Sequence, residues 1–332
     1  MGSAIKTISY SLPKNIISNN DLEKQFPDWD GSKIENKVGI RERYVVAENE
    51  TALDLAYEAC KKLLENSTIE HIDFLLLCTQ SPDYFLPTSA CILQDRLGLK
   101  RNIGAFDFNL GCSGFIYGLA MAKSLICSGV AKNVLLVTSE TYSKHIHHND
   151  KANKSIFGDA AAATLFSMSD ADKIFDFVLG TDGFGKDNLI VCNGAMRTKL
   201  SQNPVERTDE AGNFKSDNHL FMNGPEIFNF TIENIPPVFD QILEKNNILF
   251  DNVDYVIFHQ ANKYMLDYLR KKLNIPKEKF YNDILLTGNT VSSTIPIALT
   301  NCMDDKIVKE CDKVLLAGFG VGYSWGGTTI EI

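Results

Sequence analysis

Three polar residues in the sequence share one kind of position. Cys112, His259 and Asn289 each follow an apolar run and precede a stretch with helical spacing. In α/β sheets such positions lie at the carboxyl ends of strands, where ligands bind. A thiol that performs acyl transfer needs a partner that manages protons and donors that stabilise an oxyanion. An imidazole and an amide supply both functions, so these residues together predict acyl chemistry on a cysteine.

The sequence around Cys112 reads FDFNLGCSGFIYGLAMAKSLICSG, from Phe106 to Gly129. A short apolar run at Ile103–Asn109 predicts a buried strand, and the apolar spacing behind the cysteine predicts a helix. The cysteine therefore falls at a helix N-terminus, where free N–H groups and the helix dipole favour a thiolate. The same pattern also fits an inert, small buried thiol.

Each of the other two residues has a structural alternative as well. His259 stands beside Gln260 in a polar stretch, where a histidine can serve a purely structural hydrogen bond, and Asn289 lies in Gly-Asn-Thr, a common turn sequence. The order Cys, His, Asn is also that of papain-like proteases. Those enzymes carry the cysteine near the mature N-terminus in a C-G-S-C-W type signature, whereas this chain has Gly-Cys-Ser-Gly-Phe after several βα units. The protease interpretation is therefore disfavoured.

Composition narrows the class of protein. The chain has 332 residues, 44% hydrophobic and 23% charged, which is ordinary for a globular protein of two halves. A net charge of −9 without a basic tract argues against a nucleic-acid partner. No apolar run is long enough to span a membrane, and the N-terminus lacks the apolar core of a signal peptide. We therefore expect a cytoplasmic protein that binds neither nucleic acid nor membrane.

The cysteines and histidines do not suggest a metal or cofactor. Eight cysteines without a C-x-x-C pair predict reduced, buried thiols. His145, His147 and His148 lack a Cys or Glu partner at ligand spacing, so they predict a loop of solvated histidines. We expect no metal site and no cofactor.

Alternating strand and helix patterns predict an α/β fold with largely parallel strands, divided into halves at 1–170 and 171–332. The main expected helices are Asn20–Phe26, Thr51–Leu64, Ser89–Leu97, Asn223–Glu244, Ala261–Leu273 and Ser292–Met303. The main expected strands are Lys6–Ser11, Phe74–Thr79, Val134–Thr138, Asp254–Phe258, Ile284–Leu286, Val314–Ala317 and Thr328–Ile332. Prolines 236–237 and 296 are expected to bend or break their helices. Surface loops are expected at Lys37–Tyr44, Ser139–Lys154 and Asn193–Asn218.

The motifs together resemble those of the β-ketoacyl-acyl carrier protein synthase III family, the initiating condensing enzymes of the thiolase superfamily. The matching stretches are KVGIRER at Lys37–Arg43, FLPTSACILQDRLG at Phe85–Gly98, GCSGF around Cys112, IFGDAAAA at Ile156–Ala163, FHQAN at Phe258–Asn262, GNTVSSTIP at Gly288–Pro296 and GFGVGYSWG at Gly318–Gly326. The resemblance implies a thiolase fold, with two similar halves in a five-layered αβαβα arrangement, usually as a homodimer. It implies no cofactor.

The resemblance also implies residue roles. Cys112 is the expected nucleophile that takes an acyl group from a thioester, either acyl-acyl carrier protein or acyl-coenzyme A. His259 and Asn289 are the expected donors to the carbonyl oxygen of malonyl-acyl carrier protein as it loses carbon dioxide. The backbone N–H groups of Cys112 and Val321 form the expected oxyanion hole for acyl transfer, and Phe228 packs near the centre. Two neutral donors aimed at an enolate oxygen stabilise its charge directly.

Several positions depart from the family pattern. Where coenzyme A would be held between a Trp and an Arg, this chain has Lys33 and Lys151, although Trp29 lies four residues before Lys33. Leu86 falls where a partner subunit often limits the acyl pocket. A basic residue associated with carrier docking is replaced by Tyr264. The nearby cationic cluster is a candidate docking site for an acidic carrier or, equally, the basic end of a helix; it comprises Lys263, Arg270, Lys271 and Lys272.

The sequence thus predicts a cytoplasmic, homodimeric enzyme that condenses an acyl-Cys112 intermediate with a malonyl thioester, in fatty acid or specialised acyl or polyketide biosynthesis. An acyltransferase that passes the acyl group to an alcohol or amine is the closest alternative, and Asn289 argues against it. A catalytically silent scaffold subunit is disfavoured because Cys112, His259 and Asn289 are all present.

Overall fold

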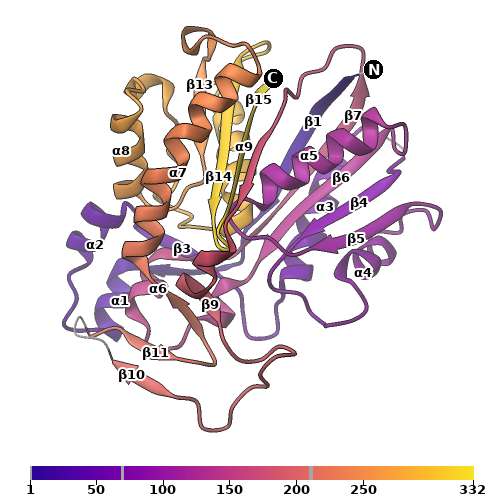
Figure 1. The fold of residues 1–332 in the computed structure, drawn as a ribbon. Coiled ribbons are helices and arrows are strands. Elements are labelled where there is room, and N and C mark those ends of the chain that lie inside the picture. The colour runs from indigo at the N-terminus through magenta and orange to yellow at the C-terminus, as the bar shows by residue number, and fades with distance from the viewer. Residues whose placement is uncertain (1, 69–70, 209–211) are drawn as a thin grey trace.

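The computed structural model describes residues 2–68, 71–208 and 212–332, which form two main sheets and the helices that cover them (Figure 1). The first sheet has the order β1 (Gly2–Ser11), β7 (Ala160–Ser169), β6 (Asn133–Glu140), β4 (Phe74–Cys78) and β5 (Gly104–Phe108). The second has the order β13 (Tyr255–Phe258), β14 (Lys313–Gly320), β15 (Ser324–Glu331) and β8 (Val178–Thr181).

Helices lie outside and between these sheets. The central pair is α5 (Gly114–Cys127) and α9 (Thr294–Asp304); the outer helices are α3 (Ala52–Glu65) and α4 (Ser89–Arg96) on the first sheet and α7 (Gly224–Lys245) and α8 (Lys263–Lys272) on the second. This is the five-layered αβαβα arrangement of the thiolase fold. The first sheet lies within residues 2–169 and the second within 178–331. The division into halves at 1–170 and 171–332 stays a prediction.

The strand sequences explain this layering. On β4, Leu75 and Leu77 pack in the core beneath α3 and α4, whereas Leu76 packs in the central core with α5. On β14, Leu315 faces the α7–α8 core and Leu316 faces the central one. Because side chains alternate along a strand, a sheet covered on both faces needs apolar residues at successive positions.

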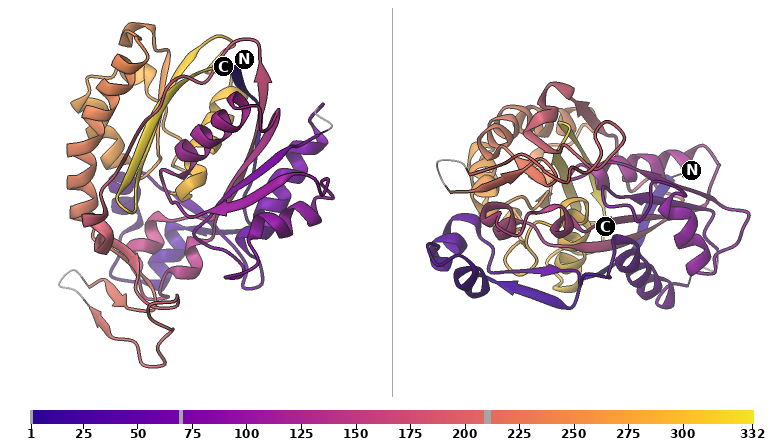
Figure 2. Two further views of the ribbon diagram at one scale, coloured as in Figure 1. Left: turned by 45° about the vertical axis from the view of Figure 1, so that its right-hand side comes forward. Right: turned by 90° about the horizontal axis from the view of Figure 1, so that it is seen from below.

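Smaller elements gather at one end of the sheets. They are the strand pairs β2 (Asn15–Ser18) with β3 (Glu42–Val45), β9 (Leu189–Val191) with β12 (Leu220–Met222) and β10 (Glu206–Thr208) with β11 (Phe214–Ser216), and the helices α1 (Asn19–Gln25), α2 (Gly31–Val38) and α6 (Lys151–Ile156). Figure 2 shows the β10–β11 hairpin projecting from the body of the molecule. The hairpin lies inside the stretch 193–218, which we expected to be a loop without strands. Within the described residues, no helix is long and apolar enough to cross a membrane.

The expectation of largely parallel strands is wrong. In the first sheet β4 pairs in parallel with β5 and β6, whereas β7 is antiparallel to both β1 and β6. In the second sheet only β13 and β14 are parallel, and β15 is antiparallel to both of its neighbours. Not every strand is followed by a crossover helix, so the chain also returns through direct antiparallel connections.

The prolines do not break their helices. Helix α7 runs from Gly224 to Lys245 through both Pro236 and Pro237, and its buried face packs in the second outer core. Pro296 is in the first turn of α9, where the missing N–H is one that would have no partner inside the helix. The expected strand at Ile284–Leu286 is instead irregular chain and turn.

Two segments that we expected at the surface are partly buried. Lys37–Tyr44 ends α2 and enters β3, and Arg43 within it is fully buried. Its guanidinium donates to the carbonyls of Ile17 and Ser155 and to Oδ1 of Asn19, which offsets the cost of burying the charge. Burial lowers the pKa of Arg43 to about 10. In Ser139–Lys154, buried residues alternate with exposed ones rather than forming a solvated excursion.

The histidine and cysteine expectations also need correction. His147 is buried, stacks on Phe214 of β11 at a ring-centroid distance of 4.1 Å and contacts His148 and His219, so the prediction of a solvated loop is wrong for His147, although His148 is exposed. Burial lowers the pKa of His147, and the neighbouring histidines lower it further. All eight cysteines are free thiols, but only Cys60, Cys78, Cys112 and Cys302 are buried.

Candidate active site

Cys112 lies in the turn between β5 and α5, two residues before the helix begins. Strand β14 passes directly against this turn. A Cβ on Gly320 would lie 2.9 Å from both the Cβ and the Sγ of Cys112, and a Cβ on Gly318 would lie 2.8 Å from the Cys112 carbonyl oxygen. Glycine is needed at both positions because any side chain would push the strand away from the sulfur. The glycine-rich segment GFGVG therefore allows the two halves of the chain to meet at Cys112.

Burial controls the protonation of this thiol. Cys112 is buried, and burial raises its pKa to about 12, with a further increase from the nearby Glu140 carboxyl. The backbone N–H groups of Cys112 and Val321 donate to the sulfur and oppose the increase. The expectation that the helix N-terminus yields a thiolate is thus wrong, because desolvation outweighs the donors. Cys112 is therefore a thiol near neutral pH.

His259 follows β13 directly, and its backbone N–H donates to the Ala317 carbonyl at 2.8 Å. The ring stands edge-on to Phe319, and its Nδ1 lies 2.7 Å from Oγ1 of Thr294. The side chain is buried, and burial lowers its pKa to about 3. The imidazole is therefore neutral at physiological pH, with Nδ1 engaged by Thr294.

Hydrogen bonds hold the backbone N–H, the backbone carbonyl and the side-chain amide of Asn289. Its N–H donates to the Ile156 carbonyl at 2.9 Å, and its carbonyl accepts from Gly158 at 3.0 Å. The Oδ1 atom accepts from the Val291 N–H at 2.9 Å, and Nδ2 lies 3.4 Å from the Ala261 carbonyl. Because the oxygen is occupied by a backbone donor, the amide presents Nδ2 as the group available to a ligand.

Val291 connects all three candidate residues. Its side chain packs in one buried cluster with Cys112, its N–H orients Asn289, and its carbonyl accepts from the Thr294 hydroxyl that contacts His259. The residue has φ +57°, a left-handed conformation that costs energy in a β-branched residue. The left-handed turn lets the N–H and the carbonyl of one residue serve both polar residues. The structure thus brings Cys112, His259 and Asn289 to one place.

Sequence reasoning missed a buried acid beside the cysteine. Glu140 ends β6, is fully buried, and accepts from the Gln80 N–H at 3.1 Å and from the hydroxyls of Ser81 and Ser292 at 3.2 and 3.3 Å. Burial raises its pKa to about 8. The only available signal was a carboxylic acid at the end of an apolar strand, as with Cys112 and His259.

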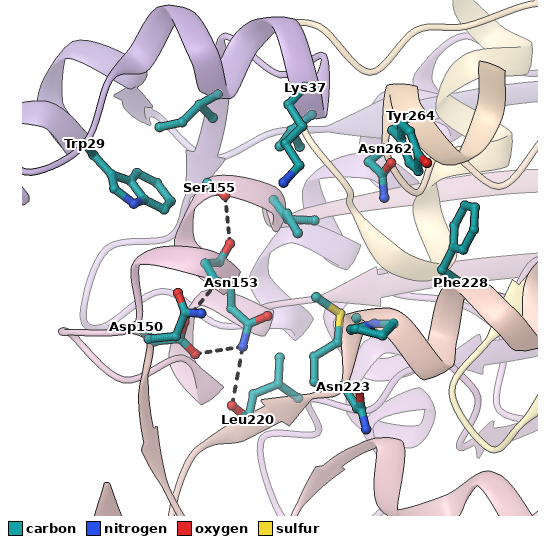
Figure 3. Close-up of a pocket in the computed structure, with 18 of the residues that line it drawn as sticks. Trp29, Lys37, Asp150, Asn153, Ser155, Leu220, Asn223, Phe228, Asn262 and Tyr264 are labelled. Atoms are coloured by element: carbon teal, nitrogen blue, oxygen red, sulfur yellow. Dashed lines mark hydrogen bonds between the residues drawn. The ribbon is translucent and has the colours of Figure 1, made fainter. Parts of the chain in front are cut away.

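A cavity of about 1010 Å³ is lined by Ile156, whose carbonyl accepts from the Asn289 N–H, but Cys112, His259 and Asn289 are not among its lining residues (Figure 3). Trp29 and Lys37 lie on one side of it and Phe228, Asn262 and Tyr264 on the other. Its walls combine residues of α2 and the segment before it with residues of α6, β11, β12, α7 and α8, so several of the small elements at this end of the sheets enclose it. Asn262 also starts α8 by accepting from the Met265 N–H at 2.9 Å. The cavity is large enough for an extended thioester arm.

The predicted substrate residues differ in their placement. Phe228 lines the cavity and packs against Tyr264 and Tyr268 of α8. Lys33 lines it too, with its amine 3.3 Å from Asp30. Lys151 is buried, and its amine is 2.6 Å from Asp28 and 6.0 Å from the Trp29 ring.

Leu86 and the cationic cluster lie elsewhere. The Leu86 side chain is 81% exposed. In the cluster, Lys263 pairs with Asp267, Arg270 donates to the Ile275 carbonyl, and Lys272 donates to the Ile232 carbonyl. Arg270, Lys271 and Lys272 lie in the last turn of α8, which favours a basic helix end for these three, whereas Lys263 is the first residue of the helix.

Comparison with known proteins identifies the family. Residues 106–183 match the family model "3-Oxoacyl-[acyl-carrier-protein (ACP)] synthase III", and residues 243–332 match its C-terminal counterpart. A "Beta-ketoacyl-[acyl-carrier-protein] synthase III" from Clostridium perfringens is 38% identical, covering 98% of this chain and 99% of the relative.

Solved structures agree with the sequence comparison. A crystal structure of a 3-oxoacyl-(acyl-carrier-protein) synthase III is 45% identical over the full length of both chains, with a TM-score of 0.98. The corresponding synthase from Burkholderia xenovorans LB400 is 34% identical, covering 100% of this chain and 94% of the other, with a TM-score of 0.92. The chain therefore belongs to the β-ketoacyl-acyl carrier protein synthase III family and is an acyltransferase of the thiolase-fold condensing enzymes.

Proposed function

We propose that the protein condenses an acyl group held on Cys112 with a malonyl thioester carried by acyl carrier protein. In the first half-reaction the Cys112 sulfur attacks the acyl thioester, and the backbone N–H groups of Cys112 and Val321 stabilise the oxyanion. In the second, malonyl-acyl carrier protein loses carbon dioxide, and the resulting enolate carbon attacks the acyl-cysteine. His259 and Asn289 donate to the enolate oxygen during this step.

The observation that carries the proposal is the shared anchoring of the two donors on Val291, beside Cys112. Asn289 has its oxygen occupied by Val291 and offers Nδ2, while His259 is neutral. Two fixed, neutral donors match a developing enolate, since they require no reorganisation as the charge forms. A transfer to an alcohol or amine would need a base for the acceptor and would make no use of Asn289.

The test separates loading from decarboxylation. Intact-mass measurement after exposure to a panel of acyl thioesters should show one acyl mass on the protein. Malonyl-acyl carrier protein should then release carbon dioxide and discharge that mass into a 3-oxoacyl product. A protein that loads but transfers its acyl group only to alcohols or amines would support the alternative acyltransferase, and a protein that never loads would support the silent scaffold.

Two observations support a homodimer. Strand β5 is the edge of the first sheet, and Phe106 on it is half-exposed. Tyr84, Phe85 and Leu86 form an exposed apolar loop nearby in the same half of the chain. An exposed strand edge with apolar neighbours is a template for pairing with a second copy. We propose that β5 pairs with β5 of another subunit and that Leu86 enters its acyl pocket. Light scattering should give twice the 37.0 kDa chain mass, and Leu86→Ala should change the preferred acyl length.

The eight free cysteines support a cytoplasmic location. Half of them are exposed, and exposed thiols persist in a reducing compartment. Thiol labelling immediately after cell lysis should therefore count all eight as reduced.

A further inference from the structure

The two half-reactions of the proposed function require opposite behaviour from one atom, Nε2 of His259. When Cys112 is loaded, its thiol must give up a proton, which a lone pair on Nε2 can accept. When the malonyl thioester decarboxylates, Nε2 must carry a hydrogen to donate to the enolate oxygen. A neutral imidazole has one N–H, so the state of Nε2 depends on which nitrogen holds it.

The structure places a single hydroxyl where it can decide between these states. Thr294 Oγ1 lies 2.7 Å from His259 Nδ1 and 3.1 Å from the Val291 carbonyl oxygen. Both side chains are buried, so water does not compete for these contacts. The hydroxyl has one hydrogen and two acceptors within reach, the carbonyl oxygen and Nδ1. The Val291 carbonyl also accepts from the His259 ring, so it can receive a ring N–H but cannot donate to Nδ1.

Each position of that hydrogen fixes a different tautomer. If the hydroxyl donates to the Val291 carbonyl, its oxygen accepts from Nδ1–H, and Nε2 is a lone pair. If the hydroxyl donates to Nδ1, the hydrogen of the imidazole is on Nε2. We propose that Thr294 is a positioning residue that keeps both tautomers of His259 accessible, so that the ring accepts a proton during loading and donates a hydrogen bond during decarboxylation.

The proton balance of the loading step follows from the first tautomer. The Cys112 S–H bond breaks as Nε2 takes the proton, and the sulfur forms a bond to the acyl carbon. The bond from that carbon to the donor sulfur then breaks, and the departing thiolate recovers the proton from Nε2. The products are acyl-Cys112 and a free donor thiol, with His259 again neutral. The proton stays on Nε2 only transiently because burial strongly disfavours the imidazolium.

The alternative is that Thr294 only stabilises the start of α9. It is the first residue of that helix, and the neighbouring Ser293 makes no capping bond with its side chain. A purely structural threonine would affect folding and both half-reactions alike. Thr300 provides the matched control, because it is buried in the same helix and donates to the Pro296 carbonyl at 2.7 Å without contacting His259.

The experiment compares Thr294→Val, Thr294→Ser and Thr300→Val in the full-length enzyme. Removing the Thr294 hydroxyl takes away the side-chain donor to Nδ1 and leaves the Val291 carbonyl as an acceptor for Nδ1–H, so Thr294→Val should slow decarboxylation of malonyl-acyl carrier protein roughly five- to tenfold. Loading of Cys112 should change by less than twofold, and Thr294→Ser should behave like the wild type in both assays. Nitrogen-15 NMR of the histidines should show the His259 shifts moving toward the Nδ1–H form in Thr294→Val alone.

Equal losses in both half-reactions, or unchanged His259 shifts in Thr294→Val, would overturn the proposal. If Thr294→Val does not fold, Thr294→Ala removes the same hydroxyl and answers the same questions. The NMR measurement is made on the resting enzyme and needs no turnover. If the wild type fails to load but the His259 shifts respond to Thr294→Val, the proposed function fails while the tautomer control stands.

Discussion

The backbone N–H of Val291 donates to Oδ1 of Asn289 at 2.9 Å, which fixes the orientation of the Asn289 amide. Without this bond the amide could present either its oxygen or its nitrogen to a ligand, and only the nitrogen stabilises an enolate. The left-handed φ of Val291 aims its N–H back along the chain toward Asn289. Local strain in one residue therefore sets the electrostatics of the proposed decarboxylation site.

Asn289→Asp tests this orientation. The substitution retains an oxygen for the Val291 N–H but replaces Nδ2 with a second carboxyl oxygen that would repel an enolate. We expect malonyl decarboxylation to fall by about 10²–10³, with a smaller effect on loading of Cys112. Carbon dioxide release and intact mass measure the two steps separately. Asn66→Asp, at the exposed end of α3, is the control for added charge. A variant that decarboxylates normally but cannot be loaded would reverse the assigned roles.

Cys112→Ala should abolish the acyl adduct, because the sulfur is the proposed attacking atom. Cys78→Ala is the matched control, since Cys78 is also buried and lies so close to the start of α5 that a Cβ on Gly114 would clash with its sulfur. Burial raises the pKa of Cys78 well above its ordinary value, and its sulfur contacts the Leu110 carbonyl at 3.0 Å. The measurement is intact mass after exposure to an acyl thioester. An adduct that persists in Cys112→Ala and disappears in Cys78→Ala would move the nucleophile to the other sulfur.

Glu140 should make stability depend on pH. Its pKa is raised from 4.5 to about 8 in the folded chain. Between these values the folded state keeps a proton that the unfolded state has lost, so the free energy of unfolding falls as pH rises and levels off above about pH 8. Glu140→Gln removes this contribution, which is at most about 1.4 kcal/mol per pH unit.

Urea unfolding at pH 5 and pH 8 checks this expectation. The wild type should lose more free energy of unfolding over this interval than Glu140→Gln does. Asp283, whose pKa burial raises to about 6, contributes equally to both proteins and cancels in the comparison. Asp159, whose pKa burial also raises to about 6, interacts electrostatically with Glu140 and cancels only in part. Equal losses in the two proteins would mean that the Glu140 carboxyl titrates in its ordinary range.

The local sequence pattern was sufficient to predict the position of a residue where that position depends on one segment alone. The Gly-Cys-Ser-Gly turn after an apolar run predicted the placement of Cys112, and the same logic located His259 at the end of β13. Asn289 instead follows irregular chain and turn, so the strand predicted before it was wrong. The predictions failed where contacts with a distant segment determine whether a residue is buried. Three charged residues in KVGIRER indicated a surface loop, but carbonyls from Ile17 and Ser155 allow Arg43 to be buried. The burial of His147 depends on Phe214, which lies far along the chain.

Dependence on distant contacts also explains why the predictions of strand direction and of the Cys112 protonation state were wrong. Antiparallel pairing of β7 with β1 joins the two ends of the first half, which strand patterns do not specify. The pKa of Cys112 depends on burial and on Glu140, and both come from tertiary contacts. The helix N-terminus was visible in the sequence, but the desolvation that outweighs it was not.

Lys33 and Lys151 bear on which thioester donor can load Cys112. A Trp–Arg pair can hold a planar base between an aromatic face and a guanidinium, whereas lysine offers a flexible point charge. Lys33 is exposed and lies beside Asp30, and Lys151 is held at Asp28 beneath Trp29. Neither can enclose adenine, so we expect coenzyme A thioesters to load Cys112 more slowly than the same acyl group on its carrier protein.

Loading rates for one acyl group on both donors, measured across a salt series, test this expectation. Carrier loading should weaken with salt if the exposed end of α8, including Lys271, attracts an acidic carrier, because such surface attraction is screened. The double variant Lys33→Trp with Lys151→Arg should accelerate loading from coenzyme A and leave carrier loading unchanged, since it restores the stacking surfaces without altering α8. If coenzyme A thioesters load the wild type as fast as the carrier does, and loading is insensitive to salt, then Lys33 and Lys151 do not determine the preferred donor. The cations of α8 would then serve only to stabilise the end of that helix.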